Sequence, residues 1–219
     1  MSVTTQTTYL AQLVAQAKTR ATERKFTQSV ELAINLKDID MKKQESILNE
    51  TIFLPNTFSS KQKICLFASG DVAVRAKETE IDKIIGPEEL NTLSETKSEA
   101  RKMAKLYNVF LAETTLMPQI GKVLGQFLGP SGKMPTPVPP NAPLDGFVKR
   151  FSSIARVRTK GQLTTACKVG DEKMSDEQIA QNAEAVLSAV EKKLPSGKGN
   201  IKNIVFKLSM SPSQKSKVQ

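Results

Sequence analysis

The sequence predicts an α/β (α+β) protein with two domains: a terminal α+β domain formed by both chain ends, and a second domain inserted into it. Three observations lead to this expectation. Helix and strand patterns occur at both ends, buried strands alternate with helices in the middle, and almost all the excess positive charge lies at the ends. The expected boundaries are 1–65 plus 155–219 for the terminal domain and 66–154 for the insert.

The two ends supply the elements of the terminal domain. Apolar residues recur at helical spacing over 8–23, and strict alternation over 29–36 predicts a half-buried strand, followed by a shorter strand over 50–54. A hairpin is expected from 156 to 169, with its turn at Lys160-Gly161. The capping box Ser175–Gln178 opens a helix that stops before Pro195. A closing strand is expected over 201–210, and a frayed tail from 211.

The middle of the chain has a different pattern of predicted elements. The continuous apolar run 64–68 leads into a helical pattern that extends through 76, which is typical of a βα unit. Further strands are expected over 81–85 and 107–112, and helices over 88–104 and 119–128. This alternation predicts a small, parallel, Rossmann-like sheet. Residues 129–143 hold six of the eleven prolines and are expected to form an ordered loop rather than a helix or an inner strand.

Composition argues against several classes of function. The chain has no histidine, which removes the commonest general base and the commonest metal ligand, so we expect no metal and no cofactor. Its two cysteines, Cys65 and Cys167, are expected to be buried, reduced thiols. No apolar run is long enough to span a membrane, and the N-terminus does not have the order of a secretory signal. The expected location is the cytoplasm.

Charge indicates the kind of partner. The net charge is +10, and residues 66–154 are almost balanced, with eleven Lys/Arg against ten Asp/Glu. Residues 155–219 carry twelve against six, and the stretches 146–170 and 195–219 contain no acidic residue. A basic surface of this kind suits an anionic polymer such as RNA. A general solubility charge is the alternative, while an acidic membrane is disfavoured because no basic amphipathic helix with bulky aromatic residues is present.

Motifs of nucleotide enzymes are absent or incomplete. The segment Gly129–Met134 resembles a phosphate loop, but Phe127 stands where the first glycine is needed, and Met134 replaces the hydroxyl residue that would hold magnesium. Residues 68–71 do not supply the glycine pattern that a Rossmann-type nucleotide-using enzyme would need. Acidic residues of the middle lie among lysines and are expected to form a solvated face. We therefore expect no enzyme, and the Rossmann-type enzyme stays as the alternative.

Three segments resemble the ribosomal protein L-one family, the protein of the mobile lateral stalk of the large ribosomal subunit. They read KFTQSVELAINLKDID (25–40), LMPQIGKVLGQFLGPSGKMPTPVPPNA (116–142) and SMSP (209–212). The second is the most specific, and its glycine-proline loop is similar to the archaeal and eukaryotic branch. The resemblance implies a two-domain fold with an inserted Rossmann-like domain. It also implies binding of large-subunit rRNA, contact with deacylated tRNA leaving the exit site, and repression of the protein's own mRNA through a leader that mimics the rRNA site.

The resemblance also implies site residues. It places rRNA contacts on the first strand and the closing segment, at Lys25, Phe26, Ser29, Glu31, Ser209, Met210 and Ser211. The family pattern at 209–211 is Thr-Met-Gly, so serine keeps the hydroxyl at 209 but adds a side chain at 211, where backbone approach is expected to be close. From the charge pattern, phosphate contacts are expected at Arg156, Arg158, Lys160, Lys198 and Lys202. From residue type alone, Phe26 is a candidate for contact with RNA, although a phenylalanine at a helix–strand junction is a core residue more often than not.

Overall fold

The computed structural model describes residues 3–40, 48–140, 143–159 and 161–217, with the backbone alone described at 3–6 and 214–217. The chain divides into two compact units. Unit 1 comprises Met1–Ser60 with Ser153–Gln219, and unit 2 comprises Lys61–Ser152. A boundary after residue 65 would cut the first strand of unit 2, β3 (Ile64–Phe67), which explains why the division lies a few residues earlier than expected.

Unit 1 is built on a four-stranded antiparallel sheet in the order β10-β9-β1-β8. These strands are β1 (Ser29–Leu36), β8 (Thr164–Asp171), β9 (Ile201–Leu208) and β10 (Gln214–Lys217). A two-stranded antiparallel sheet, β2 (Asn49–Phe53) with β7 (Ile154–Arg158), adjoins β8. Among the described residues of unit 1, the helices are α1 (Val3–Thr19), α7 (Asp176–Lys193) and the short 3-10 helix η3 (Gly197–Asn200).

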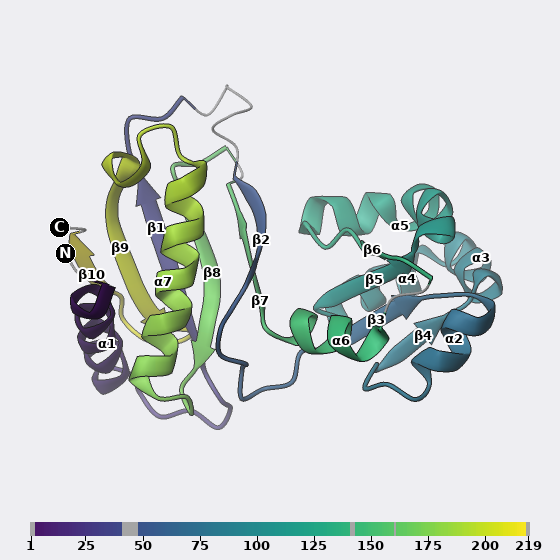
Figure 1. The fold of residues 1–219 in the computed structure, drawn as a ribbon, viewed down its shortest axis with the longest axis horizontal. Helices are drawn as coiled ribbons and strands as arrows, with labels where there is room; N and C mark the ends of the chain where they lie inside the picture. Colours follow the sequence, from purple (N-terminus) through teal and green to yellow (C-terminus); the bar gives the residue numbers. More distant parts are fainter. Residues whose placement is uncertain (1–2, 41–47, 141–142, 160, 218–219) are drawn as a thin grey trace. The chain divides into compact units, whose positions relative to one another are not determined.

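Both long helices of unit 1 pack on the same face of its sheet, side by side (Figure 1). Strand β1 shows the reason, because its residues alternate between half-buried and buried along its whole length. Val30, Leu32 and Ile34 point into the core that α1 and α7 cover. The expected capping box is confirmed: the Ser175 hydroxyl accepts from the Gln178 backbone, and the Gln178 side chain accepts from the Ser175 backbone.

Two expectations for unit 1 are wrong. The predicted hairpin of 156–169 does not form a ladder, because β7 pairs with β2 and β8 pairs with β1. Residues 214–217 are not a frayed tail but an edge strand on β9. The first error arises because strand partners far apart in the chain leave no local pattern in the sequence, and the second because β10 is a short polar segment without apolar alternation.

Unit 2 contains the expected parallel sheet, in the order β4-β3-β5-β6. With β3, its strands are β4 (Lys83–Ile85), β5 (Val109–Glu113) and β6 (Thr136–Val138). Its helices are α2 (Gly70–Ala76), α3 (Pro87–Glu95), α4 (Lys97–Leu106), α5 (Met117–Ser131) and α6 (Leu144–Ser152), with the 3-10 turn η2 (Thr114–Leu116) before α5. Every residue of β3 and β5 is buried, as expected for inner parallel strands.

The structure corrects two helix limits and one loop in unit 2. The helix expected over 88–104 is two helices that meet at Thr96, whose φ of −105° and ψ of 75° are not helical. Helix α5 continues past Pro130 to Ser131, and the capping residue Gly132 has the left-handed φ of 70° that glycine tolerates. The proline-rich segment also supplies the edge strand β6, where Pro137 interrupts no inner ladder. Helix α6 was not predicted.

Candidate nucleic-acid interface

The face of the unit 1 sheet that points away from the core carries short and polar side chains in cross-strand rows. Glu31 on β1 lies between Lys168 on β8 and Lys207 on β9. The next row is Ala166, Ala33 and Val205, and the third is Thr164, Asn35 and Asn203. The two long helices of unit 1 lie on the opposite face, so neither of them covers this one. We call it the open face.

A cluster of sequence-predicted residues lies at the start of β1. Lys25 is exposed, and the side chains of Phe26 and Met210 are 52% and 57% exposed. The Ser29 carbonyl accepts hydrogen bonds from the Ser209 backbone N–H at 3.1 Å and from the Ser209 hydroxyl at 3.4 Å. This pairing brings the segment before β1 to the segment after β9. Phe26 is therefore not a core residue, and the cluster presents two exposed apolar side chains beside a cation.

Gln28 organises this cluster, although the sequence reasoning missed it. Its side chain is buried and accepts from the Met210 backbone N–H at 3.3 Å while donating to the Thr22 carbonyl at 3.0 Å. Its own carbonyl accepts from the Glu172 backbone at 3.0 Å. Through its side-chain amide and its main-chain carbonyl, this one residue ties three separate chain segments together. The sequence offered one signal for this role: Gln28 is a polar residue directly before the alternating pattern of 29–36.

Ser211 stands where the family pattern has glycine, and its backbone conformation is one that serine adopts readily. Among the described residues other than glycine, only Asp38 has a positive φ, so position 211 does not require glycine for its backbone conformation. The Ser211 hydroxyl accepts from the Leu208 backbone N–H at 3.0 Å and lies 3.3 Å from the Leu208 carbonyl. The side chain that departs from the family pattern therefore closes the turn after β9.

The predicted phosphate contacts lie mainly at the other end of the sheet. Lys198 and Lys202 are exposed on either side of Asn200, a buried residue whose side chain donates to the Lys37 and Asp38 carbonyls at 3.2 Å and 3.4 Å. Asn200 was also missed by the sequence reasoning. The eight residues of β1 separate this end from the Phe26 cluster by about 23 Å, at ~3.3 Å per residue. The predicted site is thus two groups joined by the open face.

Ala155 and Val157 of β7 belong to the core. Arg156 and Arg158 alternate with them along the strand and therefore point away from the core. Arg158, half-buried, ends β7, and the Thr165 hydroxyl donates to its carbonyl at 3.2 Å. Arg156 is also half-buried, and this burial lowers the pKa of its guanidinium, which still leaves a cation at neutral pH. Lys160, the remaining predicted phosphate contact, lies outside the described residues.

A row of hydrogen-bonded polar side chains crosses the open face near its Asn200 end. The Thr164 hydroxyl donates to Asn35 Oδ1 at 2.8 Å, and Asn35 Nδ2 donates to Asn203 Oδ1 at 2.5 Å. This chain of bonds runs across three strands and holds each side chain in a defined orientation. The Asn203 amide group is the end of the row and can still donate to a ligand.

Lys168, a cation of the open face, forms an ion pair with Asp171. Its ammonium lies 2.6 Å from Asp171 Oδ1 and 4.6 Å from the centre of the Phe58 ring. The second Asp171 oxygen accepts from the backbone and hydroxyl of Ser60, at 3.1 Å and 3.0 Å. Asp171 is almost fully buried, so these bonds satisfy its charge and fix the last residue of the first segment of unit 1.

The described part of the chain gives little support for metal binding, membrane insertion or cysteine catalysis. It contains no group of three or more metal-ligating side chains, and none of its helices is long and apolar enough to cross a membrane. Cys65 and Cys167 are buried, free thiols, and burial raises the pKa of each to about 12, so neither is a nucleophile near neutral pH. Of the acidic residues in the middle, Glu89 pairs with Lys83 rather than standing alone in solvent.

Comparison with known proteins identifies the family to which the chain belongs. Residues 15–212 match the model of the ribosomal protein L1p/L10e family. The chain is 48% identical to the large ribosomal subunit protein uL1 of Cenarchaeum symbiosum, covering 92% of each chain. It is 45% identical to the uL1 protein of Thermofilum pendens, over 86% of this chain and 83% of that one, and 42% identical to that of Thermococcus kodakarensis, over 94% and 95%. These relatives are ribosomal proteins and not enzymes. The chain belongs to the ribosomal protein L1p/L10e family, as the three resembling segments had indicated.

Proposed function

We propose that this protein is a structural constituent of the large ribosomal subunit in the cytoplasm and binds large-subunit rRNA through unit 1. One observation carries the proposal: an open sheet face, uncovered by the long helices of unit 1, joins an exposed apolar cluster at one end to a basic group at the other. A span of about 23 Å suits a folded RNA segment better than a small ligand. The family membership supports the same assignment.

The two ends of the interface have different roles. Phe26 and Met210 offer apolar contact to sugars or bases, and the Ser29 and Ser209 side chains lie beside them for ribose hydroxyls. Lys198 and Lys202, with Arg156 and Arg158 of β7, contact phosphates, which sets affinity without reading sequence. Glu31, between two lysines, accepts from a base or a ribose hydroxyl.

Two further activities follow from the family resemblance. The protein assists the release of deacylated tRNA from the exit site, and it represses its own mRNA when the leader of that message presents the same shape to the open face. The second activity needs no additional site, because a mimic of the rRNA would use the same donors and acceptors. Competition between a leader transcript and the rRNA fragment for the full chain would test it.

The salt dependence of binding tests the phosphate role. Each lost phosphate contact flattens the log–log salt slope by roughly 0.7 to 0.9. We expect that change for Lys198→Gln and Lys202→Gln, with equal weakening of stalk rRNA and random RNA. Lys77→Gln, an exposed lysine of unit 2, is the charge-matched control and should leave the slope unchanged. Slopes that do not change in either variant would show that this basic group is only a solvated surface.

The assignment of the interface to unit 1 has its own test. The Leu54 backbone donates to the Ser153 carbonyl at 2.8 Å, so the chain re-enters unit 1 beside the segment that leaves it, and a flexible linker from Ser60 to Ser153 can replace residues 61–152. We expect the shortened chain to fold and to discriminate stalk rRNA from random RNA. A shortened chain that folds by circular dichroism but has lost this discrimination would show that unit 1 does not carry the specific site.

A further inference from the structure

Unit 2 has a pocket of about 390 Å³ between α3, α4 and the start of β4. This volume is within the range of small-ligand sites. Lys83 begins β4, and Tyr107 lies just before β5, so the pocket opens near the amino-terminal ends of the parallel strands. Nucleotide sites of Rossmann-type enzymes lie at the opposite, carboxyl ends. The pocket therefore does not lie where a Rossmann-type enzyme, the alternative function, would bind its nucleotide.

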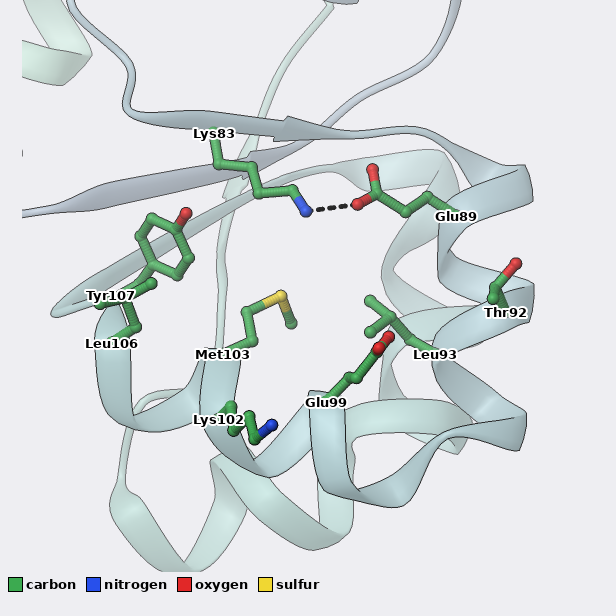
Figure 2. A pocket seen from close by; sticks show the side chains of 9 residues that line it. All are labelled: Lys83, Glu89, Thr92, Leu93, Glu99, Lys102, Met103, Leu106 and Tyr107. Atoms are coloured by element: carbon green, nitrogen blue, oxygen red, sulfur yellow. Dashed lines mark hydrogen bonds and ion pairs between the residues drawn. The ribbon is translucent and has the colours of Figure 1, made fainter.

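The floor of the pocket is apolar. Leu93 and Met103 are 7% exposed and Tyr107 is 8% exposed, while Leu106 at the rim is 52% exposed. Figure 2 shows Met103 in the middle of the pocket, with Leu93 on one side and the Tyr107 ring on the other. A flat, aromatic ligand would lie on this floor, and Leu106 is the apolar side chain that it would remove from water.

The polar rim places a donor beside an acceptor. Lys83 and Glu89 face one another across the mouth and form an ion pair, with side chains 40% and 43% exposed (Figure 2). The hydrogen bond to Glu89 raises the pKa of Lys83, so the ammonium stays charged. Burial raises the pKa of Tyr107, which keeps its hydroxyl protonated and able to donate. Glu89 can accept from N1–H and N2–H₂ of guanine, two adjacent donors that no other base presents on one edge, while Lys83 can donate to O6 or N7.

The surrounding charges favour a nucleotide over a free phosphate. Glu99 and Lys102 also line the pocket, so its rim carries two cations and two anions and suits a neutral base. Of the two rim cations, Lys83 is paired with Glu89, whereas Lys102 lies on α4. The phosphate of a bound nucleotide would thus lie on the α4 side, next to Lys102.

We propose that this pocket binds one unpaired guanine nucleotide, with the base between Leu93 and Tyr107 against the Lys83–Glu89 pair and the phosphate toward Lys102. Unit 2 then has a nucleotide-reading site of its own, separate from the open face of unit 1. The nucleotide comes from an unpaired RNA loop or from the free pool. The RNA source rests on the proposed function, but binding of the nucleotide itself does not.

Methionine-methyl NMR on the full chain tests the proposal, because the methionines report on separate sites. Met103 lies in the pocket, Met210 in the Phe26 cluster, and Met174 in the core of unit 1. GMP should shift the Met103 methyl resonance, assigned with Met103→Leu, and should leave Met174 unchanged. AMP, CMP and UMP should bind at least about fivefold more weakly, as expected for a lost base-edge contact. An equal response to all four nucleotides, or none, overturns the proposal.

A matched pair of variants locates the contact. Glu89→Gln should weaken GMP binding at least about fivefold. Glu95→Gln removes the same charge from an exposed position on the same helix, outside the pocket, and should not weaken it. Because Lys83–Glu89 is a partly exposed pair, Glu89→Gln should leave the melting temperature nearly unchanged. If both variants bind GMP as the parent chain does, the pocket assignment is wrong.

RNA hairpins distinguish the source of the nucleotide. A hairpin with one unpaired loop guanine should shift Met103, and the same hairpin with adenine in its place should not. If GMP shifts Met103 but the guanine hairpin does not, the ligand is a free nucleotide, and the base recognition stands. A stalk rRNA fragment that fails to shift Met210 would contradict the proposed function while leaving the Met103 result intact. If apolar peptides, but not GMP, shift the Met103 methyl resonance, the pocket binds a protein segment and the nucleotide proposal is wrong.

Discussion

Phe26→Ala should weaken RNA binding far more than it weakens the fold. The Phe26 side chain is 52% exposed, so about half of its surface is buried in the free protein. Complete burial of such a side chain is worth about 1.5–3 kcal/mol, and the variant should therefore lose about 1 kcal/mol of folding free energy. An apolar or stacking contact with RNA is worth about 1–3 kcal/mol, so affinity should fall about 5- to 150-fold.

The assay compares two quantities measured on the same variants. Fluorescence anisotropy with a labelled stalk rRNA fragment gives the dissociation constant, and thermal unfolding gives the stability. Phe53→Ala is the matched control, because Phe53 is a 43% exposed phenylalanine of unit 1 on β2, outside the Phe26 cluster. It should lose a similar amount of stability and none of the RNA affinity.

A core residue gives the opposite pattern. Phe206 is fully buried on β9, and Phe206→Ala should cost about 3–5 kcal/mol of stability. Phe206→Ala should lose RNA affinity only in proportion to the fraction of the protein that is unfolded. Should Phe26→Ala behave like Phe206→Ala, or bind RNA as tightly as the parent chain, Phe26 would have no part in the interface.

Three further predictions concern stability. A Cβ added by Gly170→Ala would lie 2.7 Å from Ile179 Cγ1 under α7, so about 1–3 kcal/mol should be lost in thermal unfolding; unchanged stability would show that the helix shifts freely. Asp171→Ala removes the acceptor of a backbone N–H, a hydroxyl and an ammonium and should cost about 2 kcal/mol by denaturant titration. Burial raises the pKa of Cys65 and Cys167 from about 9 to about 12, so their contribution to stability is complete below pH about 9 and lost as pH rises toward 12. Iodoacetamide at pH 8 should therefore leave both thiols unmodified in the folded chain, and rapid alkylation would contradict their burial.

The sequence by itself determined the elements whose signals are local. The alternation over 29–36 predicted β1 with its actual limits and its core-facing side chains, because a period of two can be read directly from neighbouring residues. The capping box at Ser175 and the continuous apolar run at Ile64 located α7 and β3 for the same reason. The exposed residues of the Phe26 cluster came from the family resemblance, and composition alone could not separate Phe26 from a core residue.

Tertiary structure alone decided which strands pair and how the two ends of the interface are held. Strand β7 pairs with β2 across about a hundred residues of chain, and β10 joins β9 in a segment whose residues are mostly polar. Gln28 and Asn200 look unremarkable in the sequence, yet each buried amide joins chain segments distant in sequence at one end of the β1–β9 pair. The physical reason is that helix and strand propensities act between neighbours. Strand partners and buried polar contacts are chosen by the free energy of the whole fold, which no local pattern records.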